Sequence, residues 1–148
     1  MKKNVLLAAI IVFISFSYSD ISAQKVQSVG KIYDQDVANV FLGRVFFSFP
    51  IDKEVFQKIM ADTTGYVMFR VKKDGWIVLN RYRKVIYPDG AQVGDEEPCF
   101  VFSIDKLQEL LDRSKTGTVT LEMRGGTATL YSDGIDLDQS WLCPPVCP

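Results

Sequence analysis

The sequence predicts an α+β protein in which two βαββ repeats share one core, with helices on one face of a mostly antiparallel sheet. Three observations support this fold class. The motif Phe-x-Phe-x-Ile-Asp-Lys occurs twice, at Phe47–Lys53 and at Phe100–Lys106. A short run with apolar residues at helical spacing follows each copy. Two segments rich in β-branched or aromatic residues come next, separated by a turn dipeptide.

The first repeat unit covers residues 46–87. Asp52 is a good N-cap residue, and Pro50 favours an extended chain just before the helix. The expected elements are a strand ending near Ile51, a helix over Val55–Met60, a strand over Tyr66–Val71, a turn at Asp74-Gly75 and a strand over Trp76–Tyr87.

The second unit covers residues 99–131 and repeats the same order. Asp105 is the corresponding N-cap residue, and Gln108 is placed to close a capping box with it. The expected elements are a strand from Cys99, a helix over Leu107–Leu111, a strand over Thr118–Met123, a turn at Gly125-Gly126 and a strand over Thr127–Tyr131. One unit alone would leave its helix and sheet face uncovered, so two units are expected to share one core. The alternative is a coincidental likeness of two common segments.

The segment before the first unit predicts an extra N-terminal hairpin at a sheet edge. Residues 26–33 and 37–45 are both strand-like in composition, and they join near Asp34–Asp36. The segment 88–98 is a loop by composition, and no linker divides the chain into domains.

Residues 1–23 have the order of a secretory signal peptide: two lysines, the apolar run Val5–Phe16, and a small, polar end. The apolar run is shorter than the roughly 20 residues that span a membrane. We therefore expect a single exported domain over residues 24–148, in the periplasm, at the cell surface or outside the cell. No membrane span is expected in the mature chain.

Composition narrows the chemistry of this domain. Without residues 1–23 the chain would carry 15 basic and 17 acidic residues, so a nucleic-acid partner is not expected. The chain has no histidine. It therefore lacks the Ser–His and Cys–His nucleophile pairs and the commonest metal ligand. We expect no metal and no cofactor.

One basic segment with interleaved aromatic residues, Arg70–Lys84, is the predicted partner surface. Strand alternation would place Trp76, Tyr82 and Lys84 on one face and Arg81 and Arg83 on the other. Such segments bind protein or anionic partners. The alternative is that Trp76 belongs to the core and the charges protect an edge strand. The predicted binding residues are Trp76, Arg81, Tyr82, Arg83 and Lys84.

Two acidic clusters are weaker candidates: residues 95–97, and the group Asp133, Asp136 and Asp138. Oxygen-rich loops bind calcium, and paired carboxylates hydrolyse glycosidic bonds. Neither cluster matches a defined motif, so both are interpreted as solvated loop charge.

The expected compartment of the protein predicts which of its three cysteines form a disulfide bond. Export supplies an oxidising setting, so Cys143 and Cys147 are predicted to form a disulfide bond and Cys99 to remain a buried thiol. Two alternatives stay open: a bond from Cys99 to one of the other two, or three thiols.

These observations together predict a non-catalytic binding or interaction module for a protein or cell-envelope ligand. One alternative is a His-free hydrolase that uses Asp or Glu carboxylates. Another is a small inhibitor-like protein that caps a partner.

Overall fold

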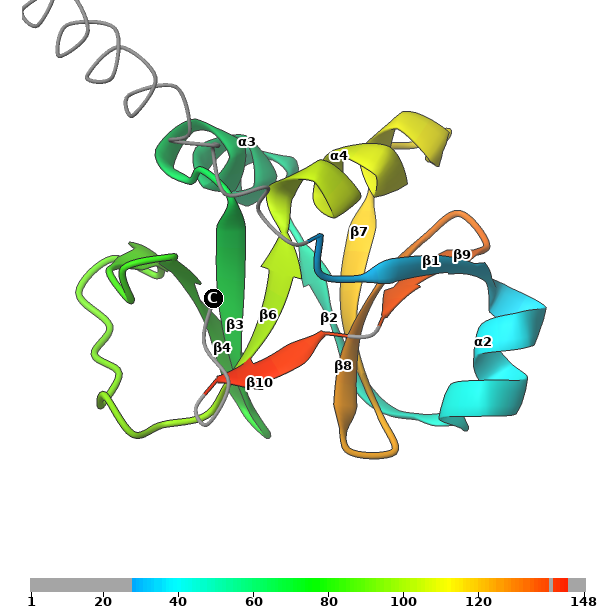
Figure 1. Ribbon diagram of the computed structural model, residues 1–148, viewed down its shortest axis with the longest axis horizontal. Coiled ribbons are helices and arrows are strands. Elements are labelled where there is room, and N and C mark those ends of the chain that lie inside the picture. The colour runs from blue at the N-terminus through cyan, green and yellow to red at the C-terminus, as the bar shows by residue number, and fades with distance from the viewer. Residues whose placement is uncertain (1–27, 139, 144–148) are drawn as a thin grey trace, which may run out of the picture.

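The computed structural model describes residues 28–138 and 140–143. Over these residues the protein is α+β, with three helices and two five-stranded antiparallel sheets (Figure 1). The expectation of one sheet is therefore wrong. The predicted signal segment, residues 1–23, lies outside the described residues, and so does Cys147.

The two sheets are built from strands that are distant in sequence. The first sheet has the order β1 (Lys31–Asp34), β9 (Ile135–Asp138), β8 (Thr127–Ser132), β7 (Val119–Arg124), β2 (Val45–Ile51). The second has the order β10 (Trp141–Cys143), β6 (Cys99–Ser103), β3 (Tyr66–Lys72), β4 (Gly75–Asn80), β5 (Val85–Tyr87). Strand β2 pairs with β7, and β6 pairs with β3, so each predicted unit contributes strands to both sheets.

One apolar core joins both sheets to two helices, α3 (Lys53–Asp62) and α4 (Ile104–Arg113). The two helices lie side by side at one end of the molecule (Figure 1). Buried residues from both predicted segments, 46–87 and 99–131, meet in this core. They include Ile59, Val67, Phe69, Phe102, Leu107, Leu121 and Leu130.

The predicted N-terminal hairpin is wrong. Strand β1 pairs with β9, and the second half of the predicted hairpin is a helix, α2 (Gln35–Leu42). Val37, Val40 and Phe41 have helical as well as strand-like spacing, and Gly43, with a φ of 75°, ends the helix. Helix α2 lies beside β1 and β9, away from α3 and α4 (Figure 1), so the helices do not share one face.

The predicted strand over Trp76–Tyr87 is interrupted by a turn. Asn80 ends β4, and its side-chain oxygen accepts hydrogen bonds from the backbone N–H groups of Tyr82 (2.9 Å) and Lys84 (3.1 Å). Arg83 takes a positive φ of 60°, which strand geometry forbids. Asparagine favours such turns because its side chain replaces a backbone acceptor. The predicted alternation of faces across residues 76–84 is therefore wrong.

The predicted Gly125-Gly126 turn is confirmed, whereas the predicted N-cap and capping box of α4 are wrong. Gly125 and Gly126 form the β7–β8 turn as predicted, with φ values of 45° and 96° that suit a two-residue hairpin. At α4 the N-cap is Ser103, so Asp105 lies in the first turn instead. Gln108 donates to Asp112, and the predicted capping box does not form.

Candidate binding surfaces

The predicted partner residues do not form one surface. Trp76 is half-buried, and its ring packs 6.4 Å from Phe69 and 5.1 Å from Tyr87 between ring centroids. Both neighbours belong to or border the main core. This packing agrees with the alternative interpretation, in which Trp76 belongs to the core.

Arg83 holds a loop in place. Its Nη2 donates to the backbone oxygens of Gly94 and Glu97, at 2.9 Å each. Val93, in the same loop, packs against a second apolar cluster on the outer side of the second sheet. Arg83 thus holds residues 93–97 of the loop beside that cluster.

The remaining three predicted residues are exposed at the β4–β5 turn. Tyr82 is 77% exposed, and the Arg81 guanidinium lies 5.2 Å from the centre of its ring. Lys84 is exposed at the end of the same turn. The structure thus gathers Arg81, Tyr82 and Lys84, and their binding role stays a prediction.

Cys99 is a buried free cysteine, in agreement with its predicted state. Burial raises the pKa of its thiol. Cys99 lies directly opposite Cys143 in the β6–β10 pairing. The predicted Cys143–Cys147 bond stays a prediction because Cys147 is outside the described residues.

A buried ionic cluster occupies the face of the first sheet that points away from the core. On β7, Leu121 faces the core, whereas Glu122 and Arg124 alternate with it and face outward. Arg124 is only 1% exposed, and its Nη2 lies 2.7 Å from a Glu122 carboxylate oxygen and 3.4 Å from Asp136 Oδ1. Burial, together with the charges of Glu122 and Asp138, raises the pKa of Asp136 to about 6, and Arg124 opposes this shift.

The interpretation of the C-terminal acidic group as solvated loop charge is wrong for two of its members. Asp136 and Asp138 lie on β9 and are buried. Asp133 alone is exposed, at the β8–β9 turn. Hydrogen bonds from the backbone N–H of Thr116 and the hydroxyl of Ser114 lower the pKa of Asp133 to about 2.

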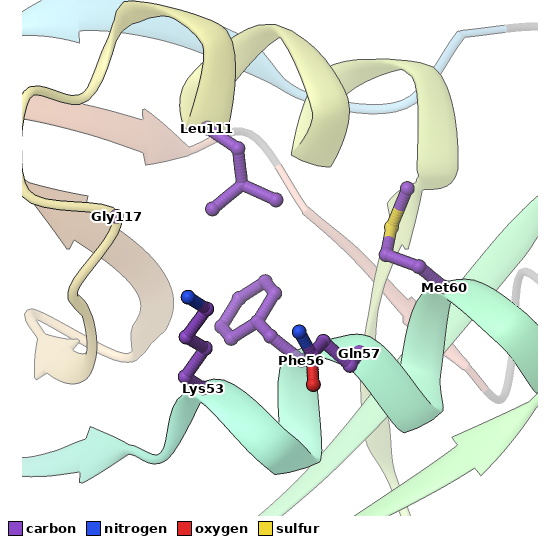
Figure 2. A pocket seen from close by; sticks show the side chains of 6 residues that line it. All are labelled: Lys53, Phe56, Gln57, Met60, Leu111 and Gly117. Carbon is purple, nitrogen blue, oxygen red and sulfur yellow. The ribbon is translucent and has the colours of Figure 1, made fainter.

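An apolar pocket of about 340 Å³ lies between α3 and α4 (Figure 2). Phe56, which is almost fully buried, extends into it from α3, and Leu111 points toward it from α4. Lys53 and Gln57 supply the polar groups of the lining. The complete lining is Lys53, Phe56, Gln57, Met60, Leu111 and Gly117.

The sequence predicted both helices but not this pocket. Phe56 and Met60 are four residues apart on α3, the spacing of a core-facing stripe. That spacing signals burial and does not show where two helices leave a space between them. Only the separation of α3 from α4 makes the pocket.

A second missed surface is the exposed apolar side of α2. Val40 and Phe41 are 79% and 75% exposed, and Val37 is 40% exposed. Val45 and Phe46, which follow the helix at the start of β2, are also exposed. We call these five residues the α2 face.

Within the described part of the chain, no group of three or more His, Cys, Asp or Glu residues is arranged to hold a metal ion. Likewise, no helix in residues 28–138 and 140–143 has the length and apolarity needed to cross a membrane.

Comparison of the chain with protein-family models, with curated proteins and with solved structures finds no match.

Proposed function

We propose that the protein is a non-catalytic binding module whose ligand site is the pocket between α3 and α4. The single observation that carries the proposal is an apolar hollow of about 340 Å³ with one cationic side chain in its lining. Its ligand is a small carboxylate with an aliphatic or aromatic body. Pockets for small ligands range from roughly 300 to 1,000 Å³, so this pocket suits a small one.

Lys53 determines the charge of the ligand. It is exposed, and it forms no ion pair in the described part of the chain. It is also the first residue of α3, where the helix dipole adds positive potential. Phe56, Met60 and Leu111 offer apolar contacts to the body of the ligand. A carboxylate beside Lys53 and a carbon chain against those residues would satisfy both parts of the lining.

The hydrolase alternative receives less support from this geometry. A glycosidase needs two carboxylates beside one substrate, and the pocket lining contains neither Asp nor Glu. Glu122 and Asp136 are close to one another, but both are buried and paired with Arg124.

The test is a titration with decanoate, followed by ¹H–¹⁵N NMR. We expect amide shifts concentrated in α3, α4 and residues 114–117. Lys53→Gln should weaken decanoate binding by roughly two- to fivefold, the effect of a partly exposed charge pair. It should leave the binding of decanol, the uncharged probe, unchanged.

Two variants control this experiment. Lys73→Gln removes an equally charged, exposed side chain at the β3–β4 turn and should change neither titration. Leu111→Trp fills the pocket and should abolish both, with amide dispersion confirming that the fold is kept. Shifts that map elsewhere, or no binding of either probe at millimolar concentration, would reject the pocket as a ligand site.

The β4–β5 turn remains the proposed contact for a protein or cell-envelope partner, as a binder or as an inhibitor-like cap. Arg81 and Lys84 are the side chains to change, because Arg83 anchors a loop. Arg81→Ser with Lys84→Ser should reduce recovery of a bound partner at low salt. Equal recovery of the same partner by the variant and the wild type would exclude the β4–β5 turn as the partner contact.

We also propose that the two predicted units are structural repeats related by an approximate two-fold operation. Two facts support this: β2-α3-β3-β4 and β6-α4-β7-β8 have the same order, and the first strand of each unit pairs with the hairpin of the other. Superposition of residues 45–80 on 99–132 tests it. The repeat is excluded if α3 does not then overlie α4.

Export and the Cys143–Cys147 disulfide complete the proposal. N-terminal sequencing of protein from a cell-envelope or medium fraction should find a start near Gln24, and an intact Met1 would contradict export. Mass mapping with thiols blocked should find the bond within one C-terminal tryptic peptide. A cross-link between that peptide and the peptide of Cys99 would contradict it.

A further inference from the structure

We propose that the α2 face is the contact between two copies of this chain, packed with their α2 helices antiparallel about a two-fold axis. This inference does not rest on the pocket, which lies at α3 and α4. The observation behind it is that α2 buries its smallest apolar side chain and exposes larger ones. The helix buries Ala38 fully, while Val40 and Phe41 are 79% and 75% exposed. Monomeric proteins rarely leave contiguous apolar surface uncovered, so this face indicates a docking site.

Polar contacts prevent α2 from turning its apolar side inward. Arg124 Nη1 donates to the side-chain oxygen of Asn39 at 2.6 Å and to the backbone oxygen of Gly43 at 3.2 Å. A roll of the helix would break both bonds and leave the Nη1 of the buried Arg124 without a hydrogen-bond acceptor. The helix end is also packed closely, since a Cβ on Gly125 would lie 3.0 Å from the Leu42 oxygen. The apolar side is therefore held toward solvent.

Charge selects a second copy as the occupant. Asp34 and Asp36 are exposed at the beginning of α2, and Arg44 is exposed just after its end. In an antiparallel pair, the acidic end of each helix lies beside the Arg44 of the other copy. Asp36 lies four residues before Val40 on the helix, and Arg44 lies just beyond the helix end at Gly43, so an axis near Val40 brings the Asp36 of each copy toward the Arg44 of the other. Antiparallel helix dipoles add a favourable term.

The same arrangement is self-complementary, as a two-fold interface requires. Val37, Val40 and Phe41 have the i, i+3, i+4 spacing of a helix–helix seam. Phe46, at the start of β2, is also exposed, and the Arg44 guanidinium lies 5.4 Å from the centre of its ring. Eight helical residues span only about 12 Å. We therefore expect weak association, with a dissociation constant on the order of tens of micromolar.

Sedimentation velocity from 10 µM to 1 mM, on the protein as purified from the producing cell, tests the proposal. We expect a monomer–dimer equilibrium. Val40→Glu places two like charges at the axis and should weaken it more than tenfold. Leu142→Glu alters another exposed apolar side chain (45%), on β10, and should leave the equilibrium unchanged.

Charge reversal tests the orientation of the helices. Asp36→Arg and Arg44→Asp should each weaken the dimer by roughly three- to tenfold through two symmetric pairs. The double variant should restore it. A mixture of the two single variants should form heterodimers, because both inter-copy charge pairs are then opposite in sign.

Three results would overturn the inference: a monomer throughout the concentration range, a dimer unaffected by Val40→Glu, or a double charge-reversal variant that dimerises no more strongly than the single variants. A monomer would mean that another kind of partner covers the α2 face. Failed rescue would exclude the antiparallel arrangement. Circular dichroism of every variant separates these outcomes from misfolding.

Discussion

Helices α2 and α4 have similar apolar spacing and opposite environments. Helix α4 buries Leu107 and Leu110 completely in the core that joins the two sheets. Helix α2 buries only Ala38 and turns its larger apolar side chains to solvent. The difference lies in what each helix covers. Under α4 are apolar side chains, whereas beside α2 lies the ionic cluster of Arg124.

Helix α2 shows that a helix can be attached by polar contacts while its larger apolar side chains face solvent. On α4 the exposed side carries charges, including Lys106 and Arg113, both of which pair with Glu109. On α2 no salt bridge within the described residues involves the helix itself. Instead, Asn39 and Gly43 bind the buried Arg124.

The largest expected effect is at the attachment of α2. Arg124→Met should lower the free energy of unfolding by about 3–5 kcal/mol, because Glu122 and Asp136 are left buried without their partner. Urea denaturation measures this loss. Hydrogen exchange should show that α2 opens more readily than α4 in the variant.

Arg113→Met on α4 is the matched control. Its side chain is half exposed and its ion pair is long, at 3.9 Å, so a change within about 0.5 kcal/mol is expected. Replacing Glu122 and Asp136 by Met and Leu together with Arg124→Met should recover much of the loss. A loss below about 1 kcal/mol for Arg124→Met alone would show that the cluster does not hold α2.

The second effect compares apolar side chains on the two helices. Leu110→Ala should cost about 2–5 kcal/mol, since the side chain is fully buried in the core. Phe41→Ala should change the free energy of unfolding of the monomer by no more than about 0.5 kcal/mol. Urea denaturation of the protein at low concentration, where it is monomeric, measures both changes in the free energy of unfolding. Similar losses of stability at the two positions would mean that Phe41 has an intramolecular contact. The two helices would then not differ in how they bury their apolar side chains.

The third effect is the pH dependence of Asp136, on β9 of the first sheet, and of Asp133, at the β8–β9 turn. Asp136 has a pKa raised to about 6 from a usual value near 3.8, so the folded state takes up a proton that the unfolded chain does not. Stability from this group therefore increases as the pH falls from 6 toward 4. Asp133, with a pKa lowered to about 2, contributes stability above pH 4 that is lost between pH 4 and pH 2.

Carboxyl ¹³C NMR should show midpoints near these two values. The wild type should also gain stability relative to Asp136→Asn as the pH falls from 7 to 4. A flat difference over that range would contradict the raised pKa. Asp133→Asn provides the opposite case, because its difference from wild type should change only below pH 4.

The local elements could largely be predicted from sequence. The helices near Val55–Met60 and Leu107–Leu111, the strand over Tyr66–Val71 and the Gly125-Gly126 turn follow from spacing, β-propensity and glycine conformation. Short-range rules failed where two of them applied to the same residues. Val37, Val40 and Phe41 fit a strand or a helix, and Asn80 ended a strand that alternation alone would have continued.

The α+β class, the order of most elements and the absence of histidine chemistry follow from the amino-acid sequence alone, because they depend on composition and on neighbours in the chain. Packing between distant segments divides the strands into two sheets, leaves a pocket between α3 and α4, and buries Asp136. It also leaves Val40 and Phe41 facing solvent. The physical reason is that apolar spacing marks one side of a helix, whereas the residues that pack beside the helix select the side that is buried.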